Sequence, residues 1–340
     1  MMSWVAPLAV APLAVAMGAL LVAGVLIWLL IGRLIVGKLL DRRLHGSSEV
    51  ERPEDRGFAT DRFWIPVDSD HRLHAWIIRP SGPGPFPCVL MVHGFHSHKD
   101  CLWSFPDEPD YRGSMMDQGA QSLCQAGFAV MAIDLRNHGQ SDSHGQVTLG
   151  QDEADDVVAA VRYLQENSER LGVAPTRIGL RGESMGAVTC LIAAAKLGDG
   201  NDQSGARVHA LWCDSPFADA PRVVADFMAY AGVSRRLAPA VIFWLNRMTR
   251  RDLRTSSPIL HASRIRCPVF VVHSEDDPLI GIDHFEELMA LDWMVTPEWW
   301  RLAGHGHNRL WKEPGYHDRQ IDFFKRHLAN FHKPNTKHAV

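Results

Sequence analysis

Short apolar runs alternate with helical patterns along most of this 340-residue chain. Strands that are apolar on both faces belong to a parallel sheet covered by helices on both sides, because a sheet with one wet face would alternate apolar and polar residues. We therefore predict an α/β fold with a mostly parallel central sheet, preceded by a hairpin over 63–67 and 73–79. The apolar runs are residues 88–92, 128–133, 177–180, 208–213, 269–272 and, more weakly, 298–302.

One connection between two of these runs, residues 215–266, is far longer than an ordinary loop. Loops of this length are usually functional or carry their own structure. This one contains two apolar helical segments, at 217–232 and 237–248. We expect a helical cap over a binding site, with an extra helix packed on the sheet as the alternative.

The first 32 residues contain no Asp, Glu, Lys or Arg, and residues 13–32 are apolar throughout. As a helix, about 20 residues span roughly 30 Å, the hydrocarbon thickness of a bilayer. A cleaved signal peptide is the competing interpretation, since residues 14–16 have the small-x-small form, but such a peptide has a positive start and a shorter apolar core. We predict a retained anchor over 1–40 with one transmembrane helix at 13–32.

The segment that follows this helix is basic, whereas the N-terminal flank has no charged side chain. The positive-inside bias then places the long C-terminal part in the cytoplasm of a single-pass membrane protein. The six cysteines form no CxxC pair and lie mostly in apolar runs, which favours buried thiols in a reducing compartment and agrees with that side. The basic residues of the flank are Arg33, Lys38, Arg42 and Arg43.

Residues 41–57 are polar and charged without apolar periodicity, and they predict a tether. A folded domain over 58–333 and a flexible tail over 334–340 complete the expected organisation.

Residues 182–186, Gly-Glu-Ser-Met-Gly, lie between an apolar strand pattern and the helical pattern of 187–197. A serine hydroxyl is a weak nucleophile and must project from a tight turn toward a base; flanking glycines permit the close backbone approach that the turn requires. The start of the helix also directs N–H groups at developing negative charge. The pattern predicts Ser184 as a nucleophile.

A tetrahedral intermediate needs two donors for its oxyanion, normally one from the residue after the nucleophile and one from the loop after an earlier strand. The run 88–92 continues into His93-Gly94-Phe95. We assign the oxyanion hole to the backbone N–H groups of Phe95 and Met185, and expect His93 to be structural.

Together with these motifs, several stretches resemble the α/β-hydrolase superfamily, in particular its membrane-anchored and serine-aminopeptidase-like members. They cover roughly residues 60–330, in the order nucleophile, acid and histidine that the superfamily shows. The resemblance implies a central sheet with helices on both faces, and a catalytic acid and histidine after Ser184. The stretches are VHGF, DLRNHGQSD, GESMG, SPILHASRIRCPVFVVHSEDDPL and GHGHN.

Three adjacent carboxylates, at 275–277, follow the fifth apolar run in one loop, and physical reasoning alone does not choose among them. The superfamily pattern His-x-x-x-Asp-Pro matches His273 with Asp277 and Pro278. The resemblance therefore implies Asp277 as the acid that orients the histidine and stabilises its charged form. Asp276 is the alternative.

For the base, Gly-His-Gly-His-Asn at 304–308 offers two histidines after the last strand. In the superfamily, a Gly-His-Asn is often followed, nine residues after the histidine, by an aromatic residue that begins the last helix. His307 with Tyr316 fits this pattern, so the resemblance implies His307. His305, which resembles a Gly-His-Gly variant, is the alternative.

These residues predict a serine hydrolase that cleaves a carboxylic ester or related acyl bond through a Ser-His-Asp triad and an acyl-enzyme intermediate. Lipid-like acyl substrates are expected because the domain would be tethered beside a bilayer. Peptidase or thioesterase activity, or a non-catalytic scaffold at the membrane, is the alternative.

Other partners are not expected. No cofactor is required for this chemistry. The histidine pairs 96/98 and 305/307 have no accompanying carboxylate–histidine motif, so no metal is expected. The net charge of −4 offers no overall basic field for nucleic acid.

Overall fold

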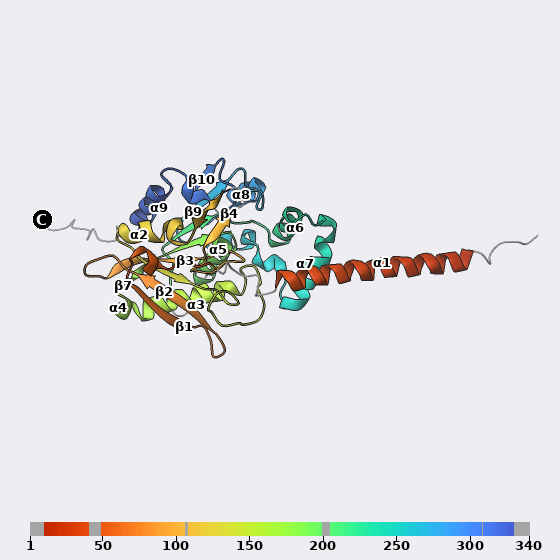
Figure 1. The fold of residues 1–340 in the computed structure, drawn as a ribbon, viewed down its shortest axis with the longest axis horizontal. Coiled ribbons are helices and arrows are strands. Elements are labelled where there is room, and N and C mark those ends of the chain that lie inside the picture. Colours follow the sequence, from red (N-terminus) through yellow and green to blue (C-terminus); the bar gives the residue numbers. More distant parts are fainter. Residues whose placement is uncertain (1–9, 41–48, 106–107, 199–204, 308, 330–340) are drawn as a thin grey trace, which may run out of the picture.

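The computed structural model describes residues 10–40, 49–105, 108–198, 205–307 and 309–329. Its centre is an eight-stranded sheet in the order β1-β2-β6-β3-β7-β8-β9-β10 (Figure 1). β1 and β2 form the expected hairpin, β2 pairs antiparallel with β6, and all later neighbours are parallel. The mostly parallel sheet is thereby confirmed. Its strands are Thr60–Pro66, Arg72–Ile78, Ala129–Ile133, Phe86–Val92, Val173–Glu183, Ala210–Asp214, Val269–Ser274 and Glu298–Leu302, in sheet order.

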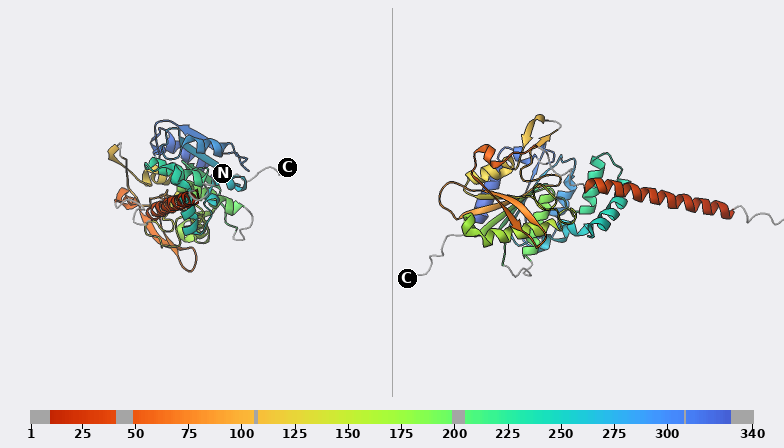
Figure 2. Two further views of the ribbon diagram at one scale, coloured as in Figure 1. Left: turned by 90° about the vertical axis from the view of Figure 1, so that its right-hand side faces the viewer. Right: turned by 60° about the horizontal axis from the view of Figure 1, so that its bottom comes forward.

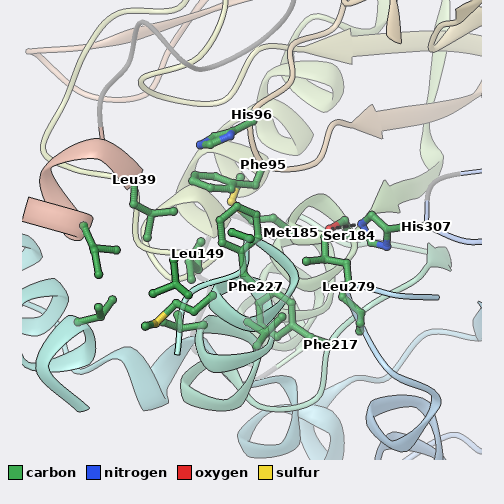
Figure 3. Close-up of a pocket in the computed structure, with 18 of the residues that line it drawn as sticks. Leu39, Phe95, His96, Leu149, Ser184, Met185, Phe217, Phe227, Leu279 and His307 are labelled. Atoms are coloured by element: carbon green, nitrogen blue, oxygen red, sulfur yellow. Dashed lines mark hydrogen bonds between the residues drawn. The ribbon is translucent and has the colours of Figure 1, made fainter. Parts of the chain in front are cut away.

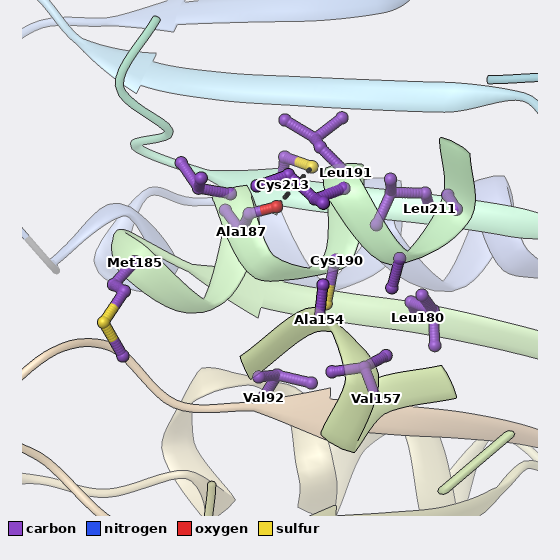
Figure 4. Packing of buried hydrophobic residues seen from close by; sticks show 14 of the residues in the cluster. Val92, Ala154, Val157, Leu180, Met185, Ala187, Cys190, Leu191, Leu211 and Cys213 are labelled. Atoms are coloured by element: carbon purple, nitrogen blue, oxygen red, sulfur yellow. Dashed lines mark hydrogen bonds between the residues drawn. The ribbon is translucent and has the colours of Figure 1, made fainter. Parts of the chain in front are cut away.

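Both faces of the sheet are buried, as the apolar strands require. Along β3, Leu90 and Val92 point into one hydrophobic cluster, whereas Val89 and Met91 point into the other. Helices α3 and α5 cover the first face, and Figure 4 shows Cys190 of α5 between strand β7 and helix α3. Helices α2 and α9 cover the second face. These helices are Gln121–Gln125 (α2), Glu153–Glu166 (α3), Met185–Gly198 (α5) and Tyr316–Phe324 (α9), with α4 at Ser168–Leu171 and α8 at Ile282–Met289.

The register of the parallel strands brings their carboxyl ends to one edge. Val92 is paired with Gly182, Glu183 with Asp214, and Ser274 with Leu302. Loops that leave neighbouring strands at this edge therefore meet, which is where open α/β sheets bind ligands.

The long insertion forms a helical cap beside this edge, as predicted. It contains α6 (Ala220–Tyr230), α7 (Ala238–Thr249) and short 3₁₀ turns between β8 and β9. Asp219 begins α6 by accepting a hydrogen bond from the Arg222 N–H, and Pro221 occupies the first turn. A small hairpin of β4 (Trp103–Phe105) and β5 (Glu108–Gly113), which the sequence did not predict, lies elsewhere in the domain.

The N-terminal apolar segment is one helix, α1 (Val10–Leu39), longer than the 13–32 expected. It is long and apolar enough to cross a membrane. Figures 1 and 2 show that it projects away from the domain and that only its C-terminal part lies beside the cap. There the indole of Trp244 donates a hydrogen bond to the Leu29 carbonyl (2.8 Å), and that of Trp28 to the Arg236 carbonyl (3.1 Å). Arg33 and Lys38 follow the apolar part and are both compatible with a helix, so α1 continues to Leu39.

The tether after α1 is shorter than the predicted 41–57, because part of this polar segment is bound to the domain. The backbone of residues 49–51 is hydrogen-bonded to Asp100 and Leu102, and Arg56 pairs with Asp117 at 2.7 Å. Residues 49–57 thus belong to the domain, because their polar groups find partners on it. The rest of that segment, 41–48, and the tail at 334–340 lie outside the described residues. All six cysteines are buried free thiols, as expected.

Candidate active site

Ser184 occupies the turn between β7 and α5 in a left-handed conformation, with φ +53°. A Cβ at Gly182 would lie 2.4 Å from the Gly186 carbonyl oxygen, and a Cβ at Gly186 would lie 2.4 Å from the His93 carbonyl oxygen. Only glycine therefore fits on either side of the serine. Such a strained strand-to-helix turn projects its side chain above the sheet.

His307 and Asp277 lie in line with this serine. His307 Nε2 is 3.2 Å from Ser184 Oγ, and His307 Nδ1 is 2.7 Å from Asp277 Oδ2. The other oxygen of Asp277 accepts hydrogen bonds from the backbone N–H groups of Leu279 (2.9 Å) and Ile280 (2.8 Å). The fold thus brings together the three residues that the sequence and the family resemblance selected.

Asp277 and His307 each stabilise the charged form of the other. Burial would raise the pKa of Asp277, but His307 and the backbone N–H of Ile280 lower it below its usual value, so the carboxylate stays ionised. Burial also lowers the pKa of His307, but Asp277 and then Glu183 outweigh this and raise the pKa above 6.5. The imidazole is therefore a stronger base than a free histidine.

The alternative residues have other partners. Asp276 accepts a hydrogen bond from the Gly304 N–H and so holds the loop that carries His307. His305 Nε2 lies 2.6 Å from Glu313 Oε2. Both side chains support the loop around the site instead of extending the Ser184–His307 line.

The two predicted oxyanion donors border the serine. Met185 is the first residue of α5, and the first N–H groups of a helix have no acceptor within it. A Cβ at Gly94 would lie 3.4 Å from the Ser184 Cβ, so the backbone leading into Phe95 runs beside the serine.

His93 supports this loop from below. Its Nδ1 donates to the Gly94 carbonyl (2.8 Å) and its Nε2 accepts from the Leu135 N–H (3.1 Å). Burial lowers its pKa to about 4, which keeps the ring neutral and able to accept that bond. These contacts fit the structural role expected for it.

A buried polar network beneath the serine was not predicted. Arg181 of β7 pairs with Asp214 and also donates to Gln118 Oε1 (2.9 Å), while the Tyr316 hydroxyl donates to Asp214 (2.6 Å). Glu183 accepts from Gln118, and burial raises its pKa to about 7. The available signal was the presence of two charged residues, Arg181 and Glu183, at the buried C-terminal end of this strand.

A pocket of about 460 Å³ opens beside Ser184 and His307, a volume typical of small-molecule sites. Apart from these two residues its lining is largely apolar. Figure 3 shows Ser184 and His307 at one end, Phe227 in the middle and Leu39 of α1 at the other end. Side chains of the cap form much of the wall, including Phe217, Val223, Val224, Phe227, Met228 and Val241.

Within the described residues, one group has a geometry that could hold a metal ion, namely Asp68, His71 and His144. However, His71 lies 3.0 Å from Asp68 through Nδ1 and 3.1 Å from Asp156 through Nε2. Both ring nitrogens therefore face carboxylates, and Asp156 raises the pKa of His71. A ring held in this way is more suited to carrying a proton than to binding a metal.

The capped, mostly parallel sheet and the serine at a strand-to-helix turn define a hydrolase of the α/β-hydrolase superfamily. Within it, a family model described as BD-FAE matches residues 77–291, and the chain belongs to that family.

Several known proteins are similar to this chain. The uncharacterized protein YqkD of Bacillus subtilis is 35% identical over 166 residues, which are 48% of this chain and 50% of YqkD. The lysophosphatidylserine lipase ABHD12 of Danio rerio is 24% identical over 249 residues, covering 72% of this chain and 62% of the lipase. The chain thus spans only part of the length of both relatives. Among solved structures, the Pyrococcus furiosus esterase Pf2001 superposes with a TM-score of 0.62 at 21% identity, over 83% of this chain and 97% of the esterase.

Proposed function

We propose that this protein hydrolyses carboxylic esters with Ser184 as nucleophile, His307 as general base and Asp277 as the acid that orients the histidine. The observation that carries the proposal is the continuous line from Ser184 Oγ to His307 Nε2 (3.2 Å) and from His307 Nδ1 to Asp277 (2.7 Å). A nucleophile, a base and an orienting carboxylate at such distances are the parts that acyl transfer requires.

The reaction proceeds in two halves. As Ser184 Oγ attacks the ester carbonyl carbon, its proton passes to His307 Nε2, and the N–H groups of Phe95 and Met185 bind the oxyanion. The C–O bond to the leaving group then breaks, and His307 gives its proton to the departing alkoxide. Water, deprotonated by His307, attacks the acyl-enzyme and releases the carboxylic acid and free Ser184.

Long-chain or lipid-like acyl esters are the substrate class that we propose. The pocket beside Ser184 is largely apolar and therefore suited to a hydrocarbon chain. The similarity to a protein named as a lysophosphatidylserine lipase supports the same class, and the similarity to a solved esterase supports ester hydrolysis.

We further propose that α1 is a retained membrane anchor and that the catalytic domain lies on the cytoplasmic side. Retention is supported by the two hydrogen bonds that join α1 to the cap, since a segment removed after export would leave that surface of the cap uncovered. The side is supported by the basic residues that follow the apolar part of the helix.

The proposal is tested by labelling the full-length protein in detergent with a fluorophosphonate probe. The same protein is assayed for hydrolysis of p-nitrophenyl butyrate and p-nitrophenyl palmitate. Ser184→Ala should abolish labelling, and His307→Ala should lower kcat/KM by roughly 10³-fold or more. The matched controls are Asp276→Asn and His305→Ala, for which we expect losses well below those of Asp277→Asn and His307→Ala. Labelling that persists in Ser184→Ala would refute the nucleophile. Cleavage of peptides or thioesters in preference to esters would redirect the substrate class.

A further inference from the structure

The C-terminal turn of α1 forms part of the pocket that contains Ser184. Ile35, Lys38 and Leu39 all line this cavity. In Figure 3, Leu39 lies at the end opposite Ser184 and His307, with Phe227 of the cap between them. The membrane helix therefore contributes side chains to the same cavity as the nucleophile.

This turn of α1 is held firmly in place. Val36 is fully buried against the domain, whereas Leu34, on the other side of the helix, is 63% exposed. Leu39 lines the pocket together with His96, which directly follows the proposed oxyanion donor Phe95 and whose pKa the Leu39 backbone raises against the effect of burial. Phe227 of α6 contacts the rings of both Phe95 and His96, with centroids 6.4 Å apart in each case. The end of α1, the cap and the oxyanion loop thus form one wall.

We propose that the last turn of α1 is the far wall of the acyl-binding site, so that a long acyl chain with its carbonyl at Ser184 contacts Ile35 and Leu39. This inference rests on the proposed ester hydrolysis and adds the residues that set chain-length preference. Short acyl groups occupy only the end of the pocket near Ser184. Long chains gain further burial of apolar area against the membrane helix, which stabilises the transition state for long esters alone.

The test compares full-length variants on p-nitrophenyl palmitate and p-nitrophenyl butyrate. Leu39→Trp and Ile35→Trp place an indole where the chain would lie, and each should lower the palmitate-to-butyrate ratio of kcat/KM by about tenfold or more. Leu34→Trp is the matched control, because it adds the same side chain on the exposed side of the same turn, and its ratio should equal that of the wild type. Unchanged ratios in both pocket variants would overturn the inference.

A binding measurement separates this inference from the proposed function. Ser184→Ala protein is titrated with the fluorescent fatty acid cis-parinarate. The titration is repeated in the same detergent with double variants that carry Leu39→Trp or Leu34→Trp in addition to Ser184→Ala. We expect Leu39→Trp to weaken binding about tenfold and Leu34→Trp to leave it unchanged. If wild-type protein cleaves no ester but this difference holds, the proposed function fails and the acyl site stands. If esters are cleaved but Leu39→Trp binds cis-parinarate like the control, the acyl site fails and the proposed function stands.

Discussion

Gly32 of α1 lies directly against Ala240 of α7. A Cβ added at Gly32 would be 2.7 Å from the Ala240 Cβ and 2.9 Å from its carbonyl carbon. Small residues at such a crossing let two helix backbones approach closely. Because the two indole hydrogen bonds between α1 and the cap lie beside this point, the crossing determines how α1 sits on the domain.

Gly32→Leu should therefore displace α1 from the cap. Overpacking of this kind costs about 1–3 kcal/mol, enough to weaken the contact without unfolding the sheet. Hydrogen-exchange mass spectrometry of the full-length protein should show faster exchange in α7, residues 238–249. Gly24→Leu is the control, since nothing lies within 4 Å of its Cβ position, and it should exchange like the wild type. Equal exchange in both variants would show that the glycine is not what seats the helix.

The pH dependence of kcat/KM should report the raised pKa of His307. The base must be neutral, so activity falls as the pH decreases through this pKa, which lies above 6.5 because of Asp277 and Glu183. Asp277→Asn removes the first of these charges. It should move the acid limb of the profile to lower pH and lower the plateau roughly 10³–10⁴-fold. His305→Ala should leave the midpoint in place, and a wild-type midpoint at or below 6.5 would contradict the assignment.

Arg181 should be essential for stability. It is fully buried and pairs with Asp214 and Glu183, so Arg181→Met leaves buried carboxyl groups without their cation. The expected loss in the free energy of unfolding is about 3–5 kcal/mol, measured by urea denaturation. Arg326→Met provides the comparison, because Arg326 and its partner Glu298 are both exposed and such pairs contribute less than about 1 kcal/mol. Similar losses in both variants would argue against a special role for the buried network.

Glu183 should make folding less favourable as the pH rises. Its pKa is raised to about 7 by burial, against 4.5 for an ordinary glutamate, so the folded protein resists the ionisation that the unfolded chain undergoes freely. The free energy of unfolding therefore decreases between about pH 4.5 and pH 7. Glu183→Gln should remove this slope, a relative gain of about 1–3 kcal/mol at neutral pH.

Glu298→Gln should behave in the opposite way. The pKa of Glu298 is lowered by Arg326, so its ionised form stabilises the folded state above about pH 4.5 and that contribution is lost on acidification. A Glu183→Gln variant whose unfolding free energy shows the same pH slope as the wild type would contradict the raised pKa.

Much of this molecule could be predicted from local patterns. The apolar runs determined a parallel sheet buried on both faces, and the glycines around Ser184 determined a turn in which no larger residue fits. Both features can be recognised from residue patterns a few positions long, although the backbone that approaches Gly186 most closely, at His93, belongs to a distant part of the chain. The length of the insertion likewise predicted a cap, but the sequence did not show which side chains of the cap would face the serine.

Only the tertiary structure decided which distant side chains meet. The order of residues left Asp276 beside Asp277 and His305 beside His307, and the family pattern alone favoured the second of each pair. In the folded protein, Asp276 binds the Gly304 N–H and His305 binds Glu313, while Asp277 reaches His307. The tertiary structure likewise decided that Arg181 is buried and that Leu39 lines the pocket. Such contacts depend on the register of the strands and on how helices that are distant in sequence dock against one another. No local stretch of sequence determines either.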